Sequence, residues 1–345
     1  MTGHVTIGWD IGGVNTKLAL VDSGQVRVVH SRAYELQRAP EALVSLLRDM
    51  AVDAGRLDPD SDLRCAVTMT AELSQMFRTK REGVGFVLDA VENAFPRADI
   101  RVFAVDGRFL ALDEARRQPL AVAAANWAAT ARLVAGRHRD ALLIDVGTTT
   151  TDIIPLVNGE VCATGWTDPD RLASGELVYS GAVRTPIEAI VPNVPYRSGS
   201  ASVSAEGFAL IGDVHVWRGD LTALDYTTPA PDGRAASREF VGERLARVIC
   251  ADRETIDEAG ISRIADAVAV AQVAQIAAAI QRVAARHPSI RTAVLAGLGS
   301  FIGERAARSA GVDTVALSSE LGDGAARCAP AAAVALLFQR ELVRA

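Results

Sequence analysis

The sequence has few of the features that mark several common classes of protein. Only 5% of its 345 residues are aromatic, and its four cysteines lie far apart without a C-x-x-C pair. That spacing argues against both a disulfide framework and a structural zinc site. The five histidines show no H-x-x-x-H or H-x-H spacing, so a histidine-based metal site is not expected, and Asp213 with His215 gives only a weak metal signal.

Charge and hydropathy exclude further classes. The net charge is −6 and no basic run occurs, so nucleic acid is not an expected partner. The longest nearly uncharged apolar stretch, residues 267–280, is too short to span a bilayer and is predicted to be a packed helix. The N-terminus runs into a strand pattern without a signal peptide. We therefore expect a cytoplasmic protein without a membrane partner, and a homo-oligomer stays open.

An internal repeat organises the chain. Residues 5–20 have the pattern of a strand, a glycine-rich turn and a strand, followed by a second turn, and residues 141–161 repeat it. The two copies align without a gap: Asp10 on Asp145, Gly12 on Gly147, Thr16 on Thr151 and Gly24 on Gly159. We therefore predict two similar α/β domains: residues 1–125, closed by a C-terminal helix at 328–345, and residues 126–327, with an insertion at about 195–250.

Hydrophobic periodicity predicts the remaining elements. Helices are expected at 40–54, 83–94, 119–136, 184–191, 204–212, 238–250, 261–286 and 330–343. Strands are expected at 63–69, 101–104, 292–296 and 314–317, and a turn-rich loop at 225–237.

The two glycine turns are candidates for binding phosphate groups. Glycine leaves backbone N–H groups accessible, and the threonines of the second turn add hydroxyl donors. The candidate residues are Gly12, Gly13, Asn15 and Thr16 in the first turn and Gly147, Thr148, Thr149 and Thr150 in the second. The alternative is that these are ordinary hairpin turns without a ligand.

Each copy of the repeat also carries an aspartate that closes an apolar strand. An unpaired carboxylate is costly there, so Asp10 and Asp145 are predicted to face a cleft and to bind a hydrated Mg²⁺ or a substrate hydroxyl. The alternative is that they cap nearby N–H groups. Lys17 is a candidate to neutralise a phosphate, or it lies on a solvated strand edge.

A third glycine turn, Gly297-Leu-Gly299-Ser300, follows a predicted strand and opens a helix. It has part of a dinucleotide-binding pattern, but the spacing of its third glycine differs, so we expect it to pack beneath a nucleotide or an equivalent group. No G-x-x-x-x-G-K-[ST] motif occurs, which excludes a Walker-type loop.

Two further segments could contact a substrate. Glu72 follows a buried strand and is a candidate base, with Arg78, Lys80 and Arg81 behind it as candidate anion contacts. A solvated helix face is an equally good interpretation of these residues. Arg184 precedes Thr185 and Pro186 at an expected helix start, where N–H groups favour anions.

These motifs resemble the phosphate and adenosine motifs of the actin, sugar-kinase and heat-shock-chaperone superfamily. Within it, segments 9–17, 70–73, 124–127, 145–152 and 183–186 resemble the hydantoinase/oxoprolinase-like proteins of the tetrahydromethanopterin-linked one-carbon pathway. The resemblance implies two ribonuclease-H-like domains around a central cleft.

The resemblance also implies a reaction. Archaeal relatives make a methanofuran precursor by joining an aminomethylfuran-methyl diphosphate to the phenol oxygen of a tyramine-derived partner, with release of diphosphate. For this chain it implies phosphorylated furan and tyrosine- or tyramine-derived phenolic substrates, with Mg²⁺ on Asp10 and Asp145 and Glu72 as the base. The motifs support equally an ATP-dependent kinase or ring-opening hydrolase with ATP in the cleft. A nucleotide-gated scaffold is the non-enzyme alternative.

Overall fold

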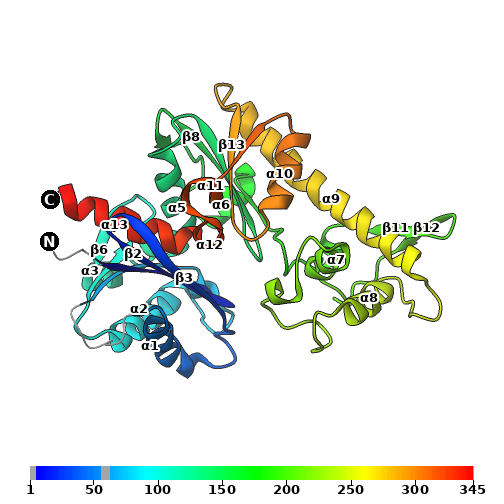
Figure 1. Cartoon of the computed structure of the whole chain (residues 1–345), viewed down its shortest axis with the longest axis horizontal. Helices are drawn as coiled ribbons and strands as arrows, with labels where there is room; N and C mark the ends of the chain where they lie inside the picture. Colours follow the sequence, from blue (N-terminus) through cyan, green and yellow to red (C-terminus); the bar gives the residue numbers. More distant parts are fainter. Residues whose placement is uncertain (1–4, 56–62, 345) are drawn as a thin grey trace.

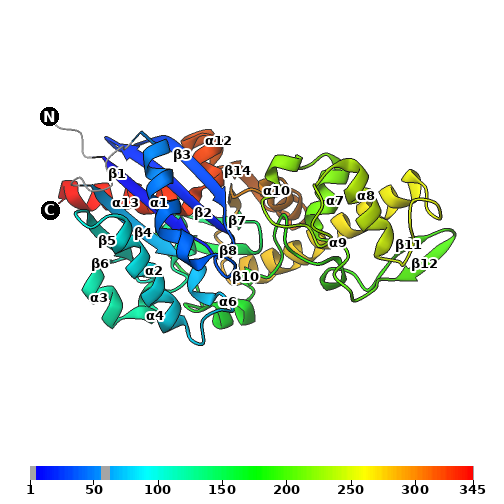
Figure 2. The same ribbon diagram turned by 90° about the horizontal axis from the view of Figure 1, so that it is seen from below.

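The computed structural model describes residues 5–55 and 63–344. Residues 1–4, which bear on the expected absence of a signal peptide, lie outside the described part. The chain builds two main sheets and an elongated arm (Figures 1 and 2). We call the first sheet with its helices the first lobe, the second sheet with its helices the second lobe, and residues 187–257 the arm.

The first sheet has six strands in the order β3-β2-β1-β4-β5-β6. Helices α1 and α2 pack together and contribute to the core on one face, while α13 contacts β1, β2 and β4 on the other. The elements of the first lobe are β1 Thr6–Ile11, β2 Asn15–Asp22, β3 Gln25–Ala33, η1 Pro40–Ala42, α1 Leu43–Asp53, β4 Arg64–Met69, η2 Ala71–Leu73, α2 Lys80–Ala94, β5 Asp99–Phe103, β6 Phe109–Ala111, α3 Leu112–Arg117, α4 Pro119–Val122 and α13 Ala329–Arg344.

The second sheet repeats the arrangement of the first. Its order is β10-β8-β7-β13-β14, with β9 also paired to β8, so an antiparallel meander is again followed by two parallel strands. Its elements are α5 Asn126–Ala135, β7 Ala141–Val146, β8 Thr151–Val157, β9 Glu160–Val161, α6 Asp168–Ser174, β10 Leu177–Val178, α9 Glu258–Ala285, β13 Thr292–Ala296, α10 Ser300–Ser309, β14 Asp313–Ala316, α11 Ser318–Leu321 and α12 Asp323–Arg327.

The predicted register of the repeat is confirmed residue by residue. Asp10 pairs with Lys17 across the first hairpin, and Asp145 pairs with Asp152 across the second. The turns that follow each meander also match, because Gly24 and Gly159 have φ values of +74° and +81°, as tight hairpins with two left-handed central residues require. A domain boundary near residue 125 remains a prediction, as do the bounds of the insertion.

Helices α5 and α13 pack against each other between the two sheets. Alternate residues of a strand face opposite sides of a sheet. In β7, Leu142, Ile144 and Val146 pack toward α9 and α10, whereas Ala141 and Leu143 pack toward α5. Asp145 therefore lies on the face that turns toward the first lobe.

The arm contains η3 Ile187–Ala189, β11 Asn193–Tyr196, β12 Gly199–Ser202, α7 Ile211–Arg218, η4 Ala223–Asp225 and α8 Arg238–Arg247. It shares a core with the first half of α9, which runs from the second lobe into the arm (Figure 1). By length and composition α9 is the one helix in the described part that could cross a membrane. It contacts α7, α8, α10, β8 and β11 instead, so the prediction of a packed helix is confirmed.

Three predicted helices are wrong. The helix at 119–136 is interrupted because Ala124 has a φ of +49°. The segment 184–191 forms only the short η3, since residues 182–184 are held in hydrogen bonds to the second hairpin. The segment 204–212 is mostly irregular, and its helix begins only at Ile211, after Leu210 forms a bridge with Pro186.

Candidate active site

The tips of the two hairpins have the same backbone geometry. The N–H of Gly12 donates to the carbonyl of Asn15 (3.0 Å), and the N–H of Gly147 donates to the carbonyl of Thr150 (2.9 Å). A side chain at Gly12 would collide with the Asn15 carbonyl, so the turn itself requires a glycine at this position. At Gly13, by contrast, a Cβ would meet nothing within 4 Å, and at Gly147 nothing closer than 3.5 Å among the described residues.

Neither Gly13 nor Gly147 has a positive φ. The fold therefore does not need a glycine at either position, and both leave room for a group that approaches the backbone closely. The side-chain amide of Asn15 and the hydroxyl of Thr16 are buried and have no hydrogen-bond partner among the described residues. Unpartnered buried polar groups of this kind are uncommon.

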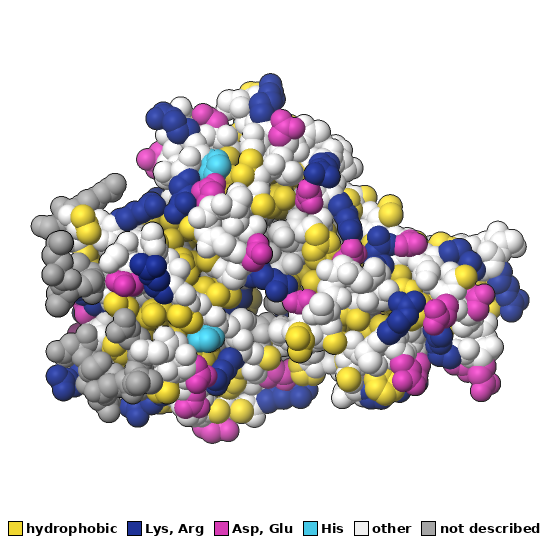
Figure 3. Space-filling view, in the orientation of Figure 1, with side chains coloured by type: hydrophobic (Ala, Val, Ile, Leu, Met, Phe, Trp, Pro, Cys, Tyr) yellow, Lys and Arg dark blue, Asp and Glu magenta, His cyan; other side chains and the backbone are white. Residues whose placement is uncertain are grey.

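Asp10 and Asp145 lie where the two lobes meet, and Lys17 belongs to the same group. Asp10 is 5% exposed and Asp145 is 8% exposed. The Lys17 ammonium lies 3.5 Å from Asp10 Oδ2, while Asp10 Oδ1 is buried without a partner in the described part. In the space-filling view the surface is hollowed where the two lobes and the arm meet (Figure 3).

Burial makes both carboxylates unusually basic. Burial raises the pKa of Asp10, and Lys17 offsets this only in part. Burial and then the neighbouring Asp152 raise the pKa of Asp145 to about 7, against the opposing effect of Lys17. Burial alone would lower the pKa of Lys17, but the negative charges around it leave that pKa raised. A site rich in buried negative charge accommodates a cation.

Cys328, directly after α12, is a further residue of this group, and its isolated position in the sequence did not indicate this. Its thiol is near enough to Lys17 and Asp10 for their charges to act on it, and burial raises its pKa. Cys65 is also buried, whereas Cys250 is exposed.

Glu72 lies in η2, directly after β4, and is 1% exposed. Burial raises the pKa of Glu72 to about 7, although backbone hydrogen bonds from Glu72 and Ala124 and the charge of Lys80 act in the opposite direction. The left-handed turn at Ala124 thus directs an N–H toward this carboxylate. A carboxyl group with a pKa near 7 is suited to general acid–base chemistry at neutral pH.

A chain of charges runs from Glu72 across the boundary between the lobes. Lys80 Nζ lies 4.0 Å from Glu72 Oε1 and 3.0 Å from Asp168 Oδ2. Arg171 then contacts Asp168 at 2.8 Å and also pairs with the buried Asp152. Its guanidinium stacks 4.5 Å from the ring centroid of Trp127, which in turn lies 5.9 Å from Trp166. The buried ring of Trp127 and the exposed ring of Trp166 therefore lie at the second-lobe end of this chain of charges.

The remaining predicted residues take different places. Arg184 is exposed, and its N–H donates to the Thr148 carbonyl. Arg78 and Arg81 are exposed at the start of α2, so the structure brings only Lys80 of that group to Glu72. Gly297 and Gly299 pack against the end of β7, where a Cβ on either would collide with Asp145 or Val146; Ser300 begins α10.

Asp213 and His215, the weak candidates for a metal site, bind different partners. Asp213 pairs with Arg244 (2.7 Å), and His215 faces Asp220 and Gln272. Within residues 5–55 and 63–344, no group of three or more His, Cys, Asp or Glu side chains is arranged to hold a metal ion. A metal between Asp10 and Asp145 would thus take its other ligands from water and substrate.

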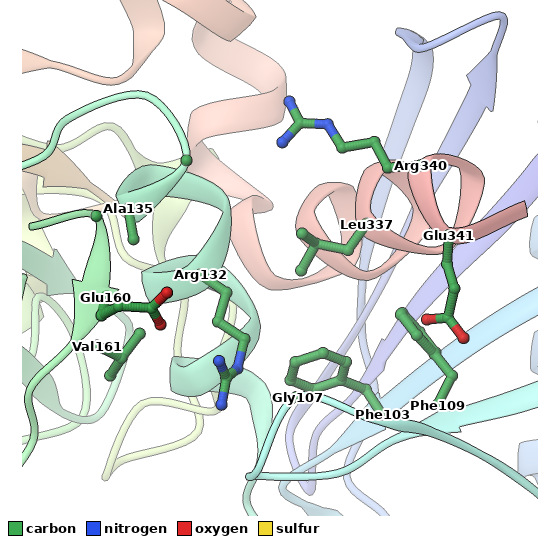
Figure 4. A pocket seen from close by; sticks show the side chains of 12 residues that line it. Phe103, Gly107, Phe109, Arg132, Ala135, Glu160, Val161, Leu337, Arg340 and Glu341 are labelled. Carbon is green, nitrogen blue, oxygen red and sulfur yellow. The ribbon is translucent and has the colours of Figure 1, made fainter. Parts of the chain in front are cut away.

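Two cavities lie elsewhere. One, of about 330 Å³, opens between α5, β9 and α13 and is lined by Phe103, Phe109, Arg132, Glu160 and Leu337 (Figure 4). Another, of about 450 Å³, lies at the far end of the arm, between β11, β12 and the start of α9. Neither contains a residue of the two hairpins, so the geometry of Asp10, Asp145 and Glu72 defines the candidate site.

Two sheets of matching topology, with glycine hairpins facing one another, define the fold of the actin, sugar-kinase and heat-shock-chaperone superfamily, as predicted. The structure is similar to nucleotide-free acetone carboxylase, from work on ATP-dependent acetone carboxylation: the TM-score is 0.57 at 12% identity, covering 96% of this chain and 70% of that one. Residues 64–341 match the hydantoinase/oxoprolinase family. The chain belongs to that family, so the predicted relationship is confirmed.

Two relatives carry one and the same name. A Methanocaldococcus jannaschii protein, (4-{4-[2-(gamma-L-glutamylamino)ethyl]phenoxymethyl}furan-2-yl)methanamine synthase, is 34% identical over 97% of this chain and 98% of its own. A Methanococcus vannielii protein of the same name is 29% identical over 59% of this chain and 93% of its own.

Proposed function

We propose that this protein is a synthase of methanofuran-type cofactor biosynthesis. It joins an aminomethylfuran-methyl diphosphate to the phenol oxygen of a tyrosine- or tyramine-derived partner. Support comes from the named relative, which matches nearly the whole chain and whose product contains a phenoxymethylfuran ether. The proposal includes small-molecule substrates and a cytoplasmic location.

The observation that carries the proposal is the pair of hairpin tips. Gly13 and Gly147 are glycines that the fold does not require, and they lie next to the two buried aspartates. Backbone N–H groups there, with Lys17 and the exposed Arg184, would bind the diphosphate and take up the charge that develops as it leaves.

The donor set suits Mg²⁺. Asp10 Oδ1 is buried without a partner in the described residues, and two carboxylates completed by water and phosphate oxygens are the usual protein share of a Mg²⁺ site. When bound, Mg²⁺ would neutralise charge on the diphosphate oxygens.

Glu72 is the proposed base for the phenol. The phenol proton passes to the Glu72 carboxylate, the phenol oxygen forms a bond to the furan methylene carbon, and the bond from that carbon to the diphosphate oxygen breaks with its electron pair on the diphosphate. Atoms and charge balance without an oxidant or reductant. Lys80 keeps part of Glu72 ionised, and the exposed ring of Trp166 offers a surface for the aromatic partner.

Titration calorimetry with Mg²⁺ and either diphosphate or ATP tests the proposal. Gly13→Ala and Gly147→Ala should each weaken diphosphate binding at least tenfold without loss of stability. Gly85→Ala is the matched control, because a Cβ there also meets nothing within 4 Å but lies on α2. Asp10→Asn and Asp145→Asn should abolish turnover, and unchanged rates would refute their assignment.

An ATP-dependent kinase or hydrolase is the second candidate, favoured by the similarity to an enzyme of ATP-dependent carboxylation. Micromolar ATP binding followed by release of ADP would make it the better assignment. Binding of diphosphate with ATP ignored would favour ether synthesis.

A further inference from the structure

The second hairpin is held from behind by a short segment, residues 180–184, which we call the strap. The N–H of Ala182 donates to the Gly147 carbonyl (2.8 Å), and the N–H of Val183 donates to the Thr148 carbonyl (3.0 Å). Gly181 lies so close that a Cβ would come within 2.5 Å of the Thr149 nitrogen. Any shift of the strap therefore shifts the hairpin.

The strap is itself fixed by a buried side chain of α9. Gln272 is fully buried, and its amide nitrogen donates to the Ser180 hydroxyl (3.0 Å) and to the Gly181 carbonyl (2.7 Å). Its amide oxygen faces Nε2 of His215 on α7, at 2.9 Å. His215 is 1% exposed, so neither side chain can exchange these partners for bulk water.

These contacts determine the protons on His215. A carbonyl can only accept a hydrogen bond, so the Gly181 carbonyl must face the NH₂ of Gln272, and Gln272 Oε1 must face His215. Nε2 of His215 therefore carries a proton. Nδ1 faces Asp220 Oδ2 at 3.3 Å, and that carboxylate also accepts from Arg218 and Arg305.

Asp220 is an acceptor as well. Hydrogen bonding from His215, Arg305 and Arg218 lowers the pKa of Asp220, against the effect of burial, so the carboxylate is ionised. Both ring nitrogens of His215 thus face acceptors, and the ring satisfies both only as an imidazolium. The Phe301 ring meets the imidazole edge-on, with 5.0 Å between the ring centroids.

We propose that Gln272 and His215 are positioning residues for the second phosphate-binding hairpin, with a buried imidazolium that fixes the Gln272 amide and, through it, the strap. This inference rests on the proposed function for the hairpin's role, but the hydrogen-bond chain can be tested separately. It also couples α7 of the arm to the hairpin, because His215 reaches the strap through α9.

The protonation state is tested by nitrogen NMR of histidine-labelled protein at pH 7, with His215 assigned from a His215→Gln variant. Two protonated ring nitrogens are expected. A neutral ring with one protonated nitrogen would overturn the imidazolium.

The positioning role is tested with Gln272→Met, which keeps the volume of the side chain but removes its hydrogen bonds. Amide hydrogen exchange in residues 180–184 should accelerate about tenfold, and the affinity for inorganic diphosphate with Mg²⁺ should fall by a similar factor. In turnover, KM should rise about tenfold with kcat within twofold. Gln275→Met is the control, since Gln275 is exposed on the same helix.

The outcomes distinguish the positioning role of Gln272 from the proposed function. Unchanged exchange and unchanged affinity in Gln272→Met would overturn the positioning role. If the wild-type protein bound no diphosphate, the proposed function would fail. Faster exchange in the strap together with a doubly protonated His215 would still support the hydrogen-bond chain in that case.

Discussion

Glu72 offers the sharpest test of the site, because its burial should be visible in both stability and activity. The pKa of its carboxyl is raised by burial from 4.5 to about 7, and the side chain is 1% exposed. The folded protein therefore holds a proton on Glu72 at pH values where the unfolded chain has released it. Between pH 4.5 and about 7 the stability contributed by this group must fall as the pH rises.

The magnitude follows from the two pKa values. Between pH 5 and pH 8 the contribution of Glu72 to the free energy of unfolding falls by about 2–3 kcal/mol. Glu72→Gln lacks this titrating group. The unfolding free energy of the variant minus that of the wild type should therefore increase by this amount from pH 5 to pH 8. Urea denaturation at the two pH values measures it.

Activity should change with pH in the opposite direction to stability. Wild-type kcat/KM should rise as the pH approaches 7 and level off above it, because the base must be ionised. Glu72→Gln should lose roughly 10²–10⁴-fold in rate at every pH. Glu41→Gln, an exposed position in the same lobe, is the control for both measurements. If the stability difference between Glu72→Gln and wild type were the same at pH 5 and pH 8, both the raised pKa and the choice of base would be refuted.

Three other variants probe separate parts of the structure. Gly8→Ala should destabilise the protein by about 1–3 kcal/mol in urea denaturation, because the new Cβ would lie 2.0 Å from the Ala331 carbonyl oxygen; wild-type stability would contradict the packing of α13 on β1. Arg184→Ala should raise the KM for the phosphorylated substrate and leave the melting temperature unchanged, and an unaltered KM removes this residue from the site. Lys80→Met should move the rise in kcat/KM to higher pH, since the charge of Lys80 lowers the pKa of Glu72; an unmoved pH profile argues against their contact.

The sequence was sufficient to predict the parts of the fold that depend on local pattern. The gap-free alignment of Asp10 with Asp145 predicted that the two meanders are equivalent, and the matching strand pairs of the two hairpins confirm it. The same pattern identified the hairpin glycines and both aspartates. These features repeat within short segments, where propensity and periodicity are informative.

The errors concern residues whose conformation depends on distant contacts. Nothing local to Ala124 indicates a left-handed residue, and its backbone N–H reaches the carboxylate of Glu72, more than fifty positions earlier. The segment 184–191 was predicted to be helical because Pro186 suits a first helical turn, yet residues 182–184 are held by hydrogen bonds to the hairpin and only η3 forms. The pair of Lys80 with Asp168 could not be predicted, because it joins α2 of the first lobe to α6 of the second.

The position of α13 has a consequence for how the chain folds. This helix covers the inner face of the first sheet, and the Gln339 amide donates to the carbonyl of Val21, 318 residues earlier. During synthesis, β1, β2 and β4 emerge long before the helix that covers them, and the face that α13 covers stays without its partner until residues 329–344 have been made. The first lobe therefore completes its core last, although its strands are made first.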